Sequence, residues 1–386
     1  MDTNCPKTIY MILSQRCNEN CVFCVTYIKG RSRFGSMTTK DAKKTIKDFM
    51  ESGGEIIAFT GGEPTLHNDL PKIIEYAESF NTLRSISIIT NGVRLADKKY
   101  FEKLIKADKK NKVSFSVSLH SHKKETSELL TTSNGTFEKT ISGIKNIIGA
   151  KKNISIYQVI TSKNYRDLPE FCYFLNQKYP QIKYVVFAYP LPYGRALFND
   201  QIYVKINSLK PYLIKALKFL EDKNYIVQMA TCGQLPLCVL PGFEEKVLDP
   251  RFFSQENVIG TIGKKYFQDF EYTKNEWIDR YKYKNKECQK CIFNKICQGL
   301  LKKYVDLFGF DGIRPVTEDN FTGNKIIHSL KNQNDAGEIT DKLIKNKLNL
   351  IKLINYSNKY LKELVNFTKQ NNIFPIIIFK NETLYP

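Results

Sequence analysis

The chain has 386 residues, 42% of them hydrophobic, so it can bury a large core, and two or three domains are expected. Its formal net charge of +20 comes mostly from lysines scattered along the chain, which indicates a solvated basic surface and leaves nucleic acid as a less favoured partner. No apolar run reaches the ~18 residues of a membrane span, and no secretion signal is recognised, so we expect a cytoplasmic protein whose cysteines do not form structural disulfides.

Residues 7 to about 190 alternate between strand-like and helix-like patterns. Thr38 or Thr39 is the expected N-cap of the first helix. Six strands, each followed by a crossover of helical length, predict an α/β fold with a parallel sheet, a partial (βα)6 TIM-type barrel. The predicted strands are 7–13, 55–60, 85–90, 112–119, 153–161 and 182–190, and the predicted helices are 38–52, 69–80, 97–107, 136–148 and 167–179.

Unusual residues follow each of the first four predicted strands. Cys17, Cys21 and Cys24 follow the first strand, and the sequences "GGEP" (61–64), "TNG" (90–92) and "HSH" (120–122) follow or end the next three. Because ligands of such sheets bind where the strands end, we expect these four segments to converge on one face.

The three cysteines have the spacing C-x3-C-x2-C. Three thiolates cannot complete a tetrahedral zinc site alone. They can hold three irons of a [4Fe–4S] cube and leave the fourth iron open to a ligand that is not protein. A zinc site with a distant fourth ligand and a set of unrelated free thiols are the alternatives.

The sequence "CNENCVFC" at the end of the first strand, with "GGEP" and "TNG" after the second and third, resembles the radical S-adenosylmethionine (AdoMet) superfamily. The resemblance covers residues 7 to about 200. It implies an enzyme that cleaves AdoMet reductively to a 5′-deoxyadenosyl radical, which abstracts hydrogen from a substrate. A reduced flavodoxin- or ferredoxin-type protein would supply the electron.

The resemblance also implies roles for individual residues. The three cysteines would bind the cluster, whose open iron would chelate AdoMet. The aromatic ring before the third cysteine would lie near the adenine, the glycine-rich segment would approach the methionyl ammonium, and two strand ends would contact the ribose or carboxylate. These cofactor-binding residues are Phe23, Gly61, Gly62, Glu63, Asn91 and Ser118.

A second group of cysteines lies in a less regular region that follows a predicted helix at 208–222. Four soft ligands there would suit a second iron–sulfur cluster or a zinc ribbon. The spacing is similar to that of C-terminal SPASM or twitch extensions of radical AdoMet enzymes, which implies an auxiliary [4Fe–4S] cluster. The preferred ligands are Cys238, Cys288, Cys291 and Cys297, with Cys232 as an alternative to Cys238.

Five other residues have simpler interpretations. His120 and His122 are favoured as loop histidines with hydrogen-bond partners, with a substrate contact as the alternative. The guanidinium of Arg195 could hold a carboxylate or phosphate, but a surface ion pair is favoured. Cys5 and Cys172 are expected to be structural.

The last part of the chain, 316–386, lies outside the resemblance and is predicted to hold one long amphipathic helix at 347–369 and a strand at 374–379. The expected domains are thus a core at 1–205, an auxiliary cluster domain at 206–315 and this extension. Modification of a ribosomally made peptide is the favoured function. A small-molecule or cofactor-biosynthesis enzyme is the alternative, and a non-catalytic nucleic-acid-binding scaffold with iron–sulfur or zinc is a further one.

Overall fold

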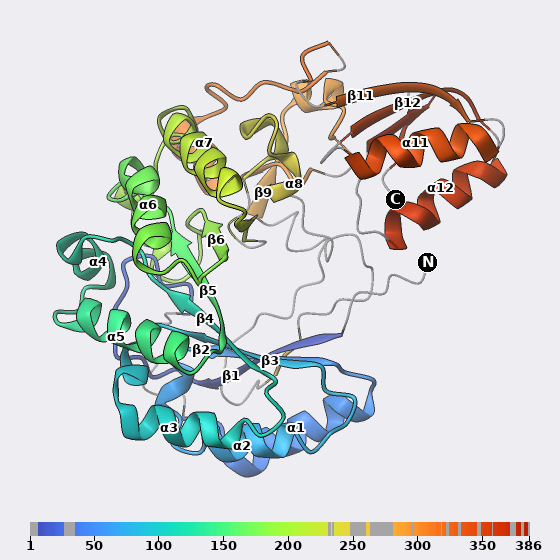
Figure 1. Ribbon diagram of the computed structural model, residues 1–386. Helices are drawn as coiled ribbons and strands as arrows, with labels where there is room; N and C mark the ends of the chain where they lie inside the picture. The colour runs from blue at the N-terminus through green and yellow to red at the C-terminus, as the bar shows by residue number, and fades with distance from the viewer. Residues whose placement is uncertain are drawn as a thin grey trace. The chain divides into compact units, whose positions relative to one another are not determined.

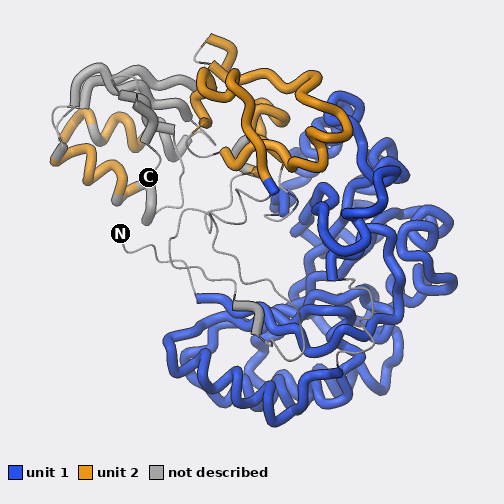
Figure 2. The backbone as a smooth tube through the Cα atoms, turned by 180° about the vertical axis from the view of Figure 1, so that it is seen from behind, with its two compact units in different colours: residues 1–234, 250–281 blue, residues 235–249, 282–386 orange. Residues whose placement is uncertain are grey.

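The structure is a computed structural model. By its contacts the chain divides into two compact units, residues 1–234 with 250–281 and residues 235–249 with 282–386 (Figure 2). The domain boundaries expected at residues 205 and 315 stay predictions. The described residues are 7–26, 35–230, 233, 235–247, 260–262, 281–294, 297–317, 319–321, 324–330, 333–345, 349–356, 358–370, 376–379 and 382–384.

An all-parallel sheet forms the first unit, with its strands in the order β7-β6-β5-β4-β3-β2-β1-β8. The α/β class and the six predicted strands are confirmed, but the predicted number of strands was too small. Two short outer strands extend the sheet, and their sequences are too brief to carry a strand pattern. The strands are β1 (Thr8–Ser14), β2 (Ile56–Gly61), β3 (Ser85–Thr90), β4 (Val113–Ser118), β5 (Asn153–Val159), β6 (Tyr184–Ala188), β7 (Ile226–Met229) and β8 (Gly260–Ile262).

Helices lie along the outer side of this sheet and follow its curve (Figure 1). The predicted helices are confirmed, and the Thr38 hydroxyl caps the first one by accepting from the Asp41 N–H at 3.1 Å. Helix α4 was not predicted, because its segment is rich in serine and threonine. The helices are α1 (Thr39–Glu51), α2 (Leu70–Ala77), α3 (Lys98–Ala107), α4 (Lys124–Thr131), α5 (Thr136–Gly149), α6 (Leu168–Lys178) and α7 (Ile206–Asp222).

Side chains alternate between two environments along the central strands. Ile86 and Ile88 of β3 and Phe115 of β4 are fully buried, whereas the intervening Ser87 and Ser114 are half-buried. Since helices cover one face of the sheet, the buried set faces the helices, and each such side chain contributes roughly 1.5–3 kcal/mol by leaving water. The half-buried polar set faces the opposite, concave side of the sheet.

The second unit contains two small sheets. Strands β9 (Lys282–Tyr283) and β10 (Leu300–Leu301) pair antiparallel, and β10 leads into α10 (Lys302–Phe308). A second sheet has the order β11-β12-β13-β14, with only its last pair antiparallel. The remaining elements of this unit are α8 (Glu244–Val247), β11 (Asn324–Leu330), α11 (Gln333–Lys345), β12 (Asn349–Tyr356), α12 (Asn358–Gln370), β13 (Ile376–Phe379) and β14 (Glu382–Leu384).

The prediction of one long helix at 347–369 was wrong. Its first half is the strand β12, which lies between β11 and β13 in the sheet, and only its second half is the helix α12. The sequence "NLIKLINY" places apolar residues at both helical and strand spacings, and a strand paired on both sides tolerates an almost continuous apolar run. The predicted strand at the end of the chain is confirmed as β13.

A buried ion pair joins two segments at the N-terminal end of the sheet. Lys152 Nζ lies 2.5 Å from Asp108 Oδ2, with the two side chains 8% and 0% exposed. Asp108 Oδ1 also accepts from the backbone N–H of Lys112 at 2.7 Å. Burial alone would raise the pKa of Asp108, but hydrogen bonds from Glu78, Lys152 and Lys112 outweigh it and lower that pKa. The lowered pKa means that Asp108 stabilises the fold above its unfolded pKa and loses this effect as the pH falls.

Removing the lysine should therefore destabilise the first unit. We expect Lys152→Met to lower the free energy of unfolding by about 3 kcal/mol, because it leaves the Asp108 carboxylate buried without its cation. Urea titration followed by circular dichroism measures this change. Lys109→Met is the matched control, since Lys109 pairs with Glu75 while 71% exposed and should change stability by less than about 0.5 kcal/mol. Equal effects of the two substitutions would contradict this interpretation.

Candidate functional site

The loop after β1 carries Cys17, Cys21 and Cys24, each half-buried. Backbone hydrogen bonds attach this loop to the end of α4, with the N–H groups of Asn20 and Val22 donating to main-chain carbonyls of that helix at 2.9 Å each. The three thiols are thus held on a loop that is fixed at its middle.

The segment Gly61–Glu63 lies directly against the chain that leads into the cysteine loop. The N–H groups of Gly62 and Glu63 donate to the carbonyls of Ser14 and Arg16 at 2.8 Å each. Gly61 has a φ of +124°, and a Cβ there would lie 2.6 Å from the Ser14 oxygen. A Cβ on Gly62 would collide with the Arg16 carbonyl. Both glycines are required by this close backbone approach, whatever they contact in a ligand.

Glu63 joins the loops that follow β2 and β3. Its Oε1 accepts from the Thr65 N–H at 3.0 Å, from the Thr65 hydroxyl at 2.6 Å and from the Thr90 hydroxyl at 2.7 Å. Its Oε2 accepts from the Asn91 N–H at 2.7 Å. Burial raises the pKa of Glu63, and the hydrogen bonds from Thr65, Asn91 and Thr90 oppose that rise. The Glu63 carboxylate therefore holds the loops after β2 and β3 together in the interior of the site.

Asn91 connects the third strand end to the cysteine loop. Its Nδ2 donates to Asn18 Oδ1 at 2.7 Å and lies 3.9 Å from the Cys17 sulfur, while its Oδ1 accepts from the Val93 N–H at 3.1 Å. The structure thus gives Asn91 a positioning role toward Cys17. Ser118, the other expected ligand contact, is the last residue of β4 and is half-buried.

Phe23 packs against the histidine that follows β4. The rings of Phe23 and His120 are 4.6 Å apart and meet edge to face. His120 Nδ1 accepts from the Val159 N–H at 3.2 Å, and burial lowers the pKa of His120 to about 3. His120 is therefore neutral, and its hydrogen-bond partner confirms the favoured interpretation. The ring of His122 is tilted against that of Phe174, with centroids 5.9 Å apart, and its buried Nδ1 has no hydrogen-bond partner in the described part of the chain, contrary to the expectation for this residue.

Arg195 binds the cysteine loop. Its guanidinium donates to the backbone oxygen and to Oδ1 of Asn20, and it lies 3.4 Å from the Cys21 carbonyl oxygen. The Arg195 N–H donates to the Cys24 carbonyl at 2.9 Å. The arginine therefore supports the loop from a segment that follows β6, a role the sequence interpretation missed.

Glu19 is a buried residue of the loop that the sequence interpretation also missed. The Cys21 thiol donates to Glu19 Oε2 at 3.6 Å, and the Glu19 N–H donates to the Cys17 sulfur at 3.4 Å. Burial, with a smaller contribution from the charge of Glu63, raises the pKa of Glu19 to about 7. The position of Glu19 between two cysteines of the motif is the sequence signal that could have identified it as a residue of the site.

Two thiols of this loop, those of Cys17 and Cys21, are protonated at neutral pH. Burial raises the pKa of Cys17 to about 12 and that of Cys21 well above its ordinary value, and the neighbouring Cys24 raises both further. Thiols that affect one another in this way lie close together. They can bind metal as thiolates if the metal displaces their protons.

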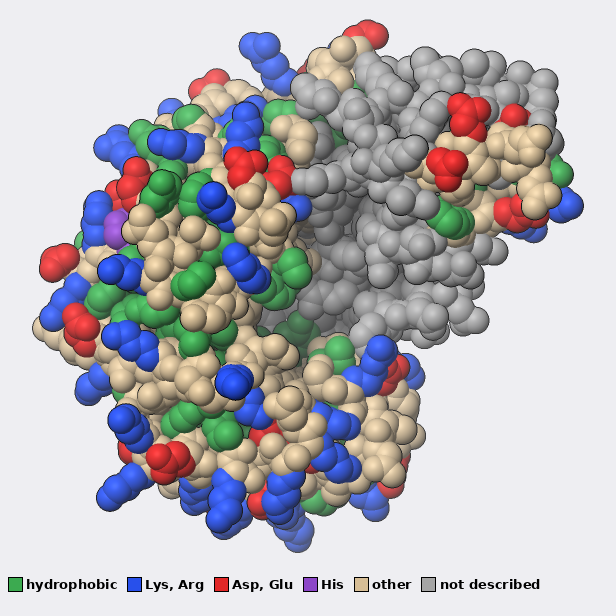
Figure 3. Space-filling model, in the orientation of Figure 1, with side chains coloured by type: hydrophobic (Ala, Val, Ile, Leu, Met, Phe, Trp, Pro, Cys, Tyr) green, Lys and Arg blue, Asp and Glu red, His purple; other side chains and the backbone are tan. Residues whose placement is uncertain are grey.

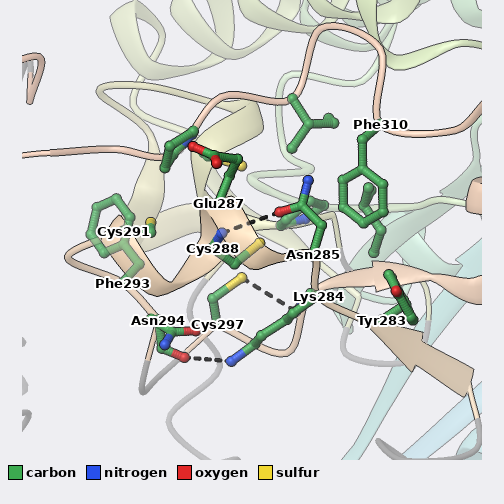
Figure 4. Close-up of a pocket in the computed structure, with 16 residues that line it drawn as sticks. Tyr283, Lys284, Asn285, Glu287, Cys288, Cys291, Phe293, Asn294, Cys297 and Phe310 are labelled. Atoms are coloured by element: carbon green, nitrogen blue, oxygen red, sulfur yellow. Dashed lines mark hydrogen bonds between the residues drawn. The ribbon is translucent and has the colours of Figure 1, made fainter.

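Four cysteines line one pocket of the second unit (Figure 4). Burial raises the pKa of Cys238, with smaller contributions from the three neighbouring thiols Cys297, Cys291 and Cys288. The Gly299 N–H donates to the Cys297 sulfur at 3.3 Å. The structure thus brings together the four preferred ligands of the second site. The alternative ligand Cys232 lies outside the described residues, as does Cys5, whereas Cys172 is fully buried in α6 as expected of a structural cysteine.

Thiolates are soft ligands that suit both zinc and iron–sulfur clusters, so the donor chemistry of both thiol sets fits either kind of centre. In the described part of the chain, no group of three or more Cys, His, Asp or Glu side chains is placed to hold a single metal ion. The same described residues contain no helix long and apolar enough to cross a membrane.

Comparison with known proteins agrees with this geometry. Residues 11–175 match the family described as the Radical SAM superfamily. The chain is 26% identical over 221 residues to Fe-coproporphyrin III synthase of Methanosarcina barkeri and 30% identical over 206 residues to GTP 3′,8-cyclase of Clostridium botulinum. These matches cover 57% and 52% of this chain, and the chain spans only 53% and 62% of the length of those relatives.

A solved structure, native anSMEcpe with bound AdoMet and Kp18Cys peptide, shares the fold with a TM-score of 0.55. The two chains are 18% identical, and the match covers 80% of this chain and 93% of the other. Because 80% of 386 residues is well beyond the 165 residues of the family match (175 − 11 + 1), the shared fold extends outside that segment.

The glycine contact leads to a direct test. Gly62→Ala should lower stability by roughly 1–3 kcal/mol, because its Cβ would push the Arg16 carbonyl and the cysteine loop out of place. Gly149→Ala, where nothing lies within 4 Å of the added Cβ, should leave stability nearly unchanged. Thermal unfolding of the two variants checks this, and a neutral Gly62→Ala would remove close packing as the reason for glycine.

Proposed function

We propose that the chain is a radical SAM enzyme, which uses the segment that matches this family, residues 11–175, to modify a peptide by radical chemistry. The observation that carries the proposal is the packing of Gly61–Glu63 and Asn91 against the loop that carries three half-buried thiols. Those contacts hold three soft ligands in place and leave a fourth position without a cysteine. Such an arrangement suits a cluster with one open iron.

Cys17, Cys21 and Cys24 would hold the [4Fe–4S] cluster. When bound, the cluster supplies the electron that cleaves AdoMet reductively to the 5′-deoxyadenosyl radical, which then abstracts hydrogen from the substrate. The chain's own contribution is to fix the three thiolates through Arg195 and the end of α4, and to shield them from water.

The AdoMet-binding residues would act in two ways. Phe23 and Ser118 lie at the loop and strand ends where the nucleoside would bind, and backbone groups of Gly61 and Gly62 would meet the methionyl part. Glu63 and Asn91 would act mainly as positioning residues, since their polar atoms already bind Thr65, Thr90, Asn18 and Val93.

The four cysteines of the second unit would hold an auxiliary [4Fe–4S] cluster. Four thiolate ligands would occupy every iron, so this cluster would transfer an electron or shape the site without binding substrate directly. Structural zinc is the alternative.

Two substrate classes compete. A peptide is favoured because the fold shared with the peptide-bound anSMEcpe covers 80% of this chain, beyond the family segment. A small molecule is the second candidate, because the relatives at 26% and 30% identity are a porphyrin enzyme and a GTP cyclase. A non-catalytic scaffold is disfavoured, since residues 11–175 match the Radical SAM superfamily and the chain is similar to those enzymes over about half of its length.

Formation of 5′-deoxyadenosine tests the catalytic proposal. The anaerobically reconstituted, dithionite-reduced chain should release it from AdoMet, and Cys24→Ala should abolish release because only two thiols remain. Cys172→Ala, which removes a buried thiol outside the loop, should retain it. Stronger stimulation by the peptide fraction of the source cell than by small molecules would favour the peptide substrate, and no product from the unaltered chain would overturn the proposal.

Metal analysis tests the auxiliary cluster. Two [4Fe–4S] clusters correspond to about eight irons per chain, and replacing Cys288, Cys291 and Cys297 by alanine should leave about four. Elemental analysis that found one zinc per chain in place of those four irons would establish the zinc alternative.

A further inference from the structure

The concave side of the eight-stranded sheet is rich in hydroxyl groups and has no charge. Charged residues make up 25% of the chain, and Lys and Arg side chains are spread over the face visible in Figure 3, but the strands β1 to β8 contain no Asp, Glu, Lys or Arg. Parallel strands that are buried on both faces are almost continuously apolar. The strands β3 and β4 instead alternate serine with apolar residues, so their concave side is suited to contact polar atoms.

The strand register brings several of these polar side chains together near the C-terminal ends of the strands. Ser116 of β4 pairs with Ser155 of β5, which in turn pairs with Tyr184 of β6. Ser118 and Gln228 belong to the row of residues one step closer to the strand ends. Paired residues of neighbouring strands point to the same face. The Tyr184 hydroxyl accordingly donates to Gln228 Oε1 at 2.6 Å across this face.

Three serine hydroxyls of these rows have no hydrogen-bond partner in the part of the chain that the structure describes. They belong to Ser116, Ser118 and Ser155, each of which is half-buried. Ser114, one row further from the strand ends, differs because its hydroxyl donates to the Ile86 carbonyl at 3.2 Å. A ligand that covers the three unpaired hydroxyls must replace their water with hydrogen bonds, since a buried polar group without a partner is unfavourable.

The chemistry of this face selects against a charged ligand. A phosphate or carboxylate placed on it would find no Lys or Arg on the strands, and a charge buried without a partner is strongly unfavourable. Two charged residues at the same end of the sheet, Glu63 and Arg195, already bind protein groups. A hydroxyl both donates and accepts a hydrogen bond, so these serines match the N–H and C=O groups of a peptide and its uncharged side chains.

The serine rows lie beside the predicted cluster loop. Ser118 ends β4, and two residues later the ring of His120 lies 4.6 Å from the ring of Phe23, which belongs to that loop. The loop itself follows the C-terminal end of β1, at the same end of this parallel sheet. A substrate bound to the serine rows would therefore lie next to the centre that starts the reaction.

We propose that the concave side of the sheet binds an uncharged segment of the peptide substrate, with Ser116 and Ser155 as residues that determine specificity. The inference rests on the proposed function and names its substrate class more closely: the residues around the modified position carry no charge. Rejection of charged residues then comes from the loss of their hydration, which nothing on these strands replaces.

Three pools of synthetic peptides test this specificity. The pools consist of short randomised peptides of uncharged residues and differ only in a central Asn, Asp or Lys. The anaerobically reconstituted chain with AdoMet should retain the Asn pool about tenfold more strongly than either charged pool, as measured by mass spectrometry of the bound peptides. Equal retention of the three pools, or retention of none, would overturn the proposal.

Substitutions of the two serines separate recognition from folding. Ser116→Lys should shift the preference from the Asn pool to the Asp pool, which a purely structural role of Ser116 would not do. Ser116→Ala combined with Ser155→Ala, which adds no bulk, should weaken retention of the Asn pool about tenfold through the loss of two hydrogen bonds. Ser114→Ala is the matched control and should leave retention unchanged, because its hydroxyl already binds Ile86. An unchanged preference in Ser116→Lys would contradict the proposal.

The binding measurement is independent of turnover. If the unaltered chain retains the Asn pool but forms no 5′-deoxyadenosine with dithionite, the proposed function fails and the specificity of this face stands. If it forms 5′-deoxyadenosine but retains no pool, the specificity proposal fails alone. GTP serves as an anionic small-molecule probe, and GTP binding that the paired alanine substitutions weaken would also overturn the proposal.

Discussion

The candidate site depends on one buried carboxylate and the close backbone contact beside it. Glu63 is 1% exposed and binds Thr65, Thr90 and Asn91, so it joins the ends of β2 and β3. Its own N–H donates to Arg16, one residue before Cys17. A carboxylate buried without such partners would be strongly unfavourable, so these contacts stabilise one another and fix the loop that carries the thiols.

Local patterns predicted much of this arrangement. The spacing of Cys17, Cys21 and Cys24 and the strand that precedes them are read from adjacent residues, and the order of a parallel sheet places the four motif segments at one edge. The residues that contact those motifs in the folded chain could not be predicted from adjacent residues. Arg195 binds Asn20 from 175 positions away in the chain, and such a contact has no sequence signature.

The errors in the fold prediction also have physical reasons. Strand β12 was predicted as helix because its apolar residues satisfy both periods, and its pairing with β11 and β13 decided the outcome. The glycines of "GGEP" were interpreted through a ligand, whereas the structure first requires them for contact with Ser14 and Arg16. In both cases tertiary neighbours, which the local sequence does not reveal, determined the role.

The central claim is that the three-cysteine loop holds a cluster with an iron open to AdoMet. Electron paramagnetic resonance of the reduced chain, with Cys288, Cys291 and Cys297 replaced so that one cluster remains, tests it most directly. Our account predicts a [4Fe–4S] signal whose g-values shift when AdoMet is added, because AdoMet becomes a ligand of the open iron. A signal that AdoMet leaves unchanged, or a chain that binds no iron in this loop, would contradict it.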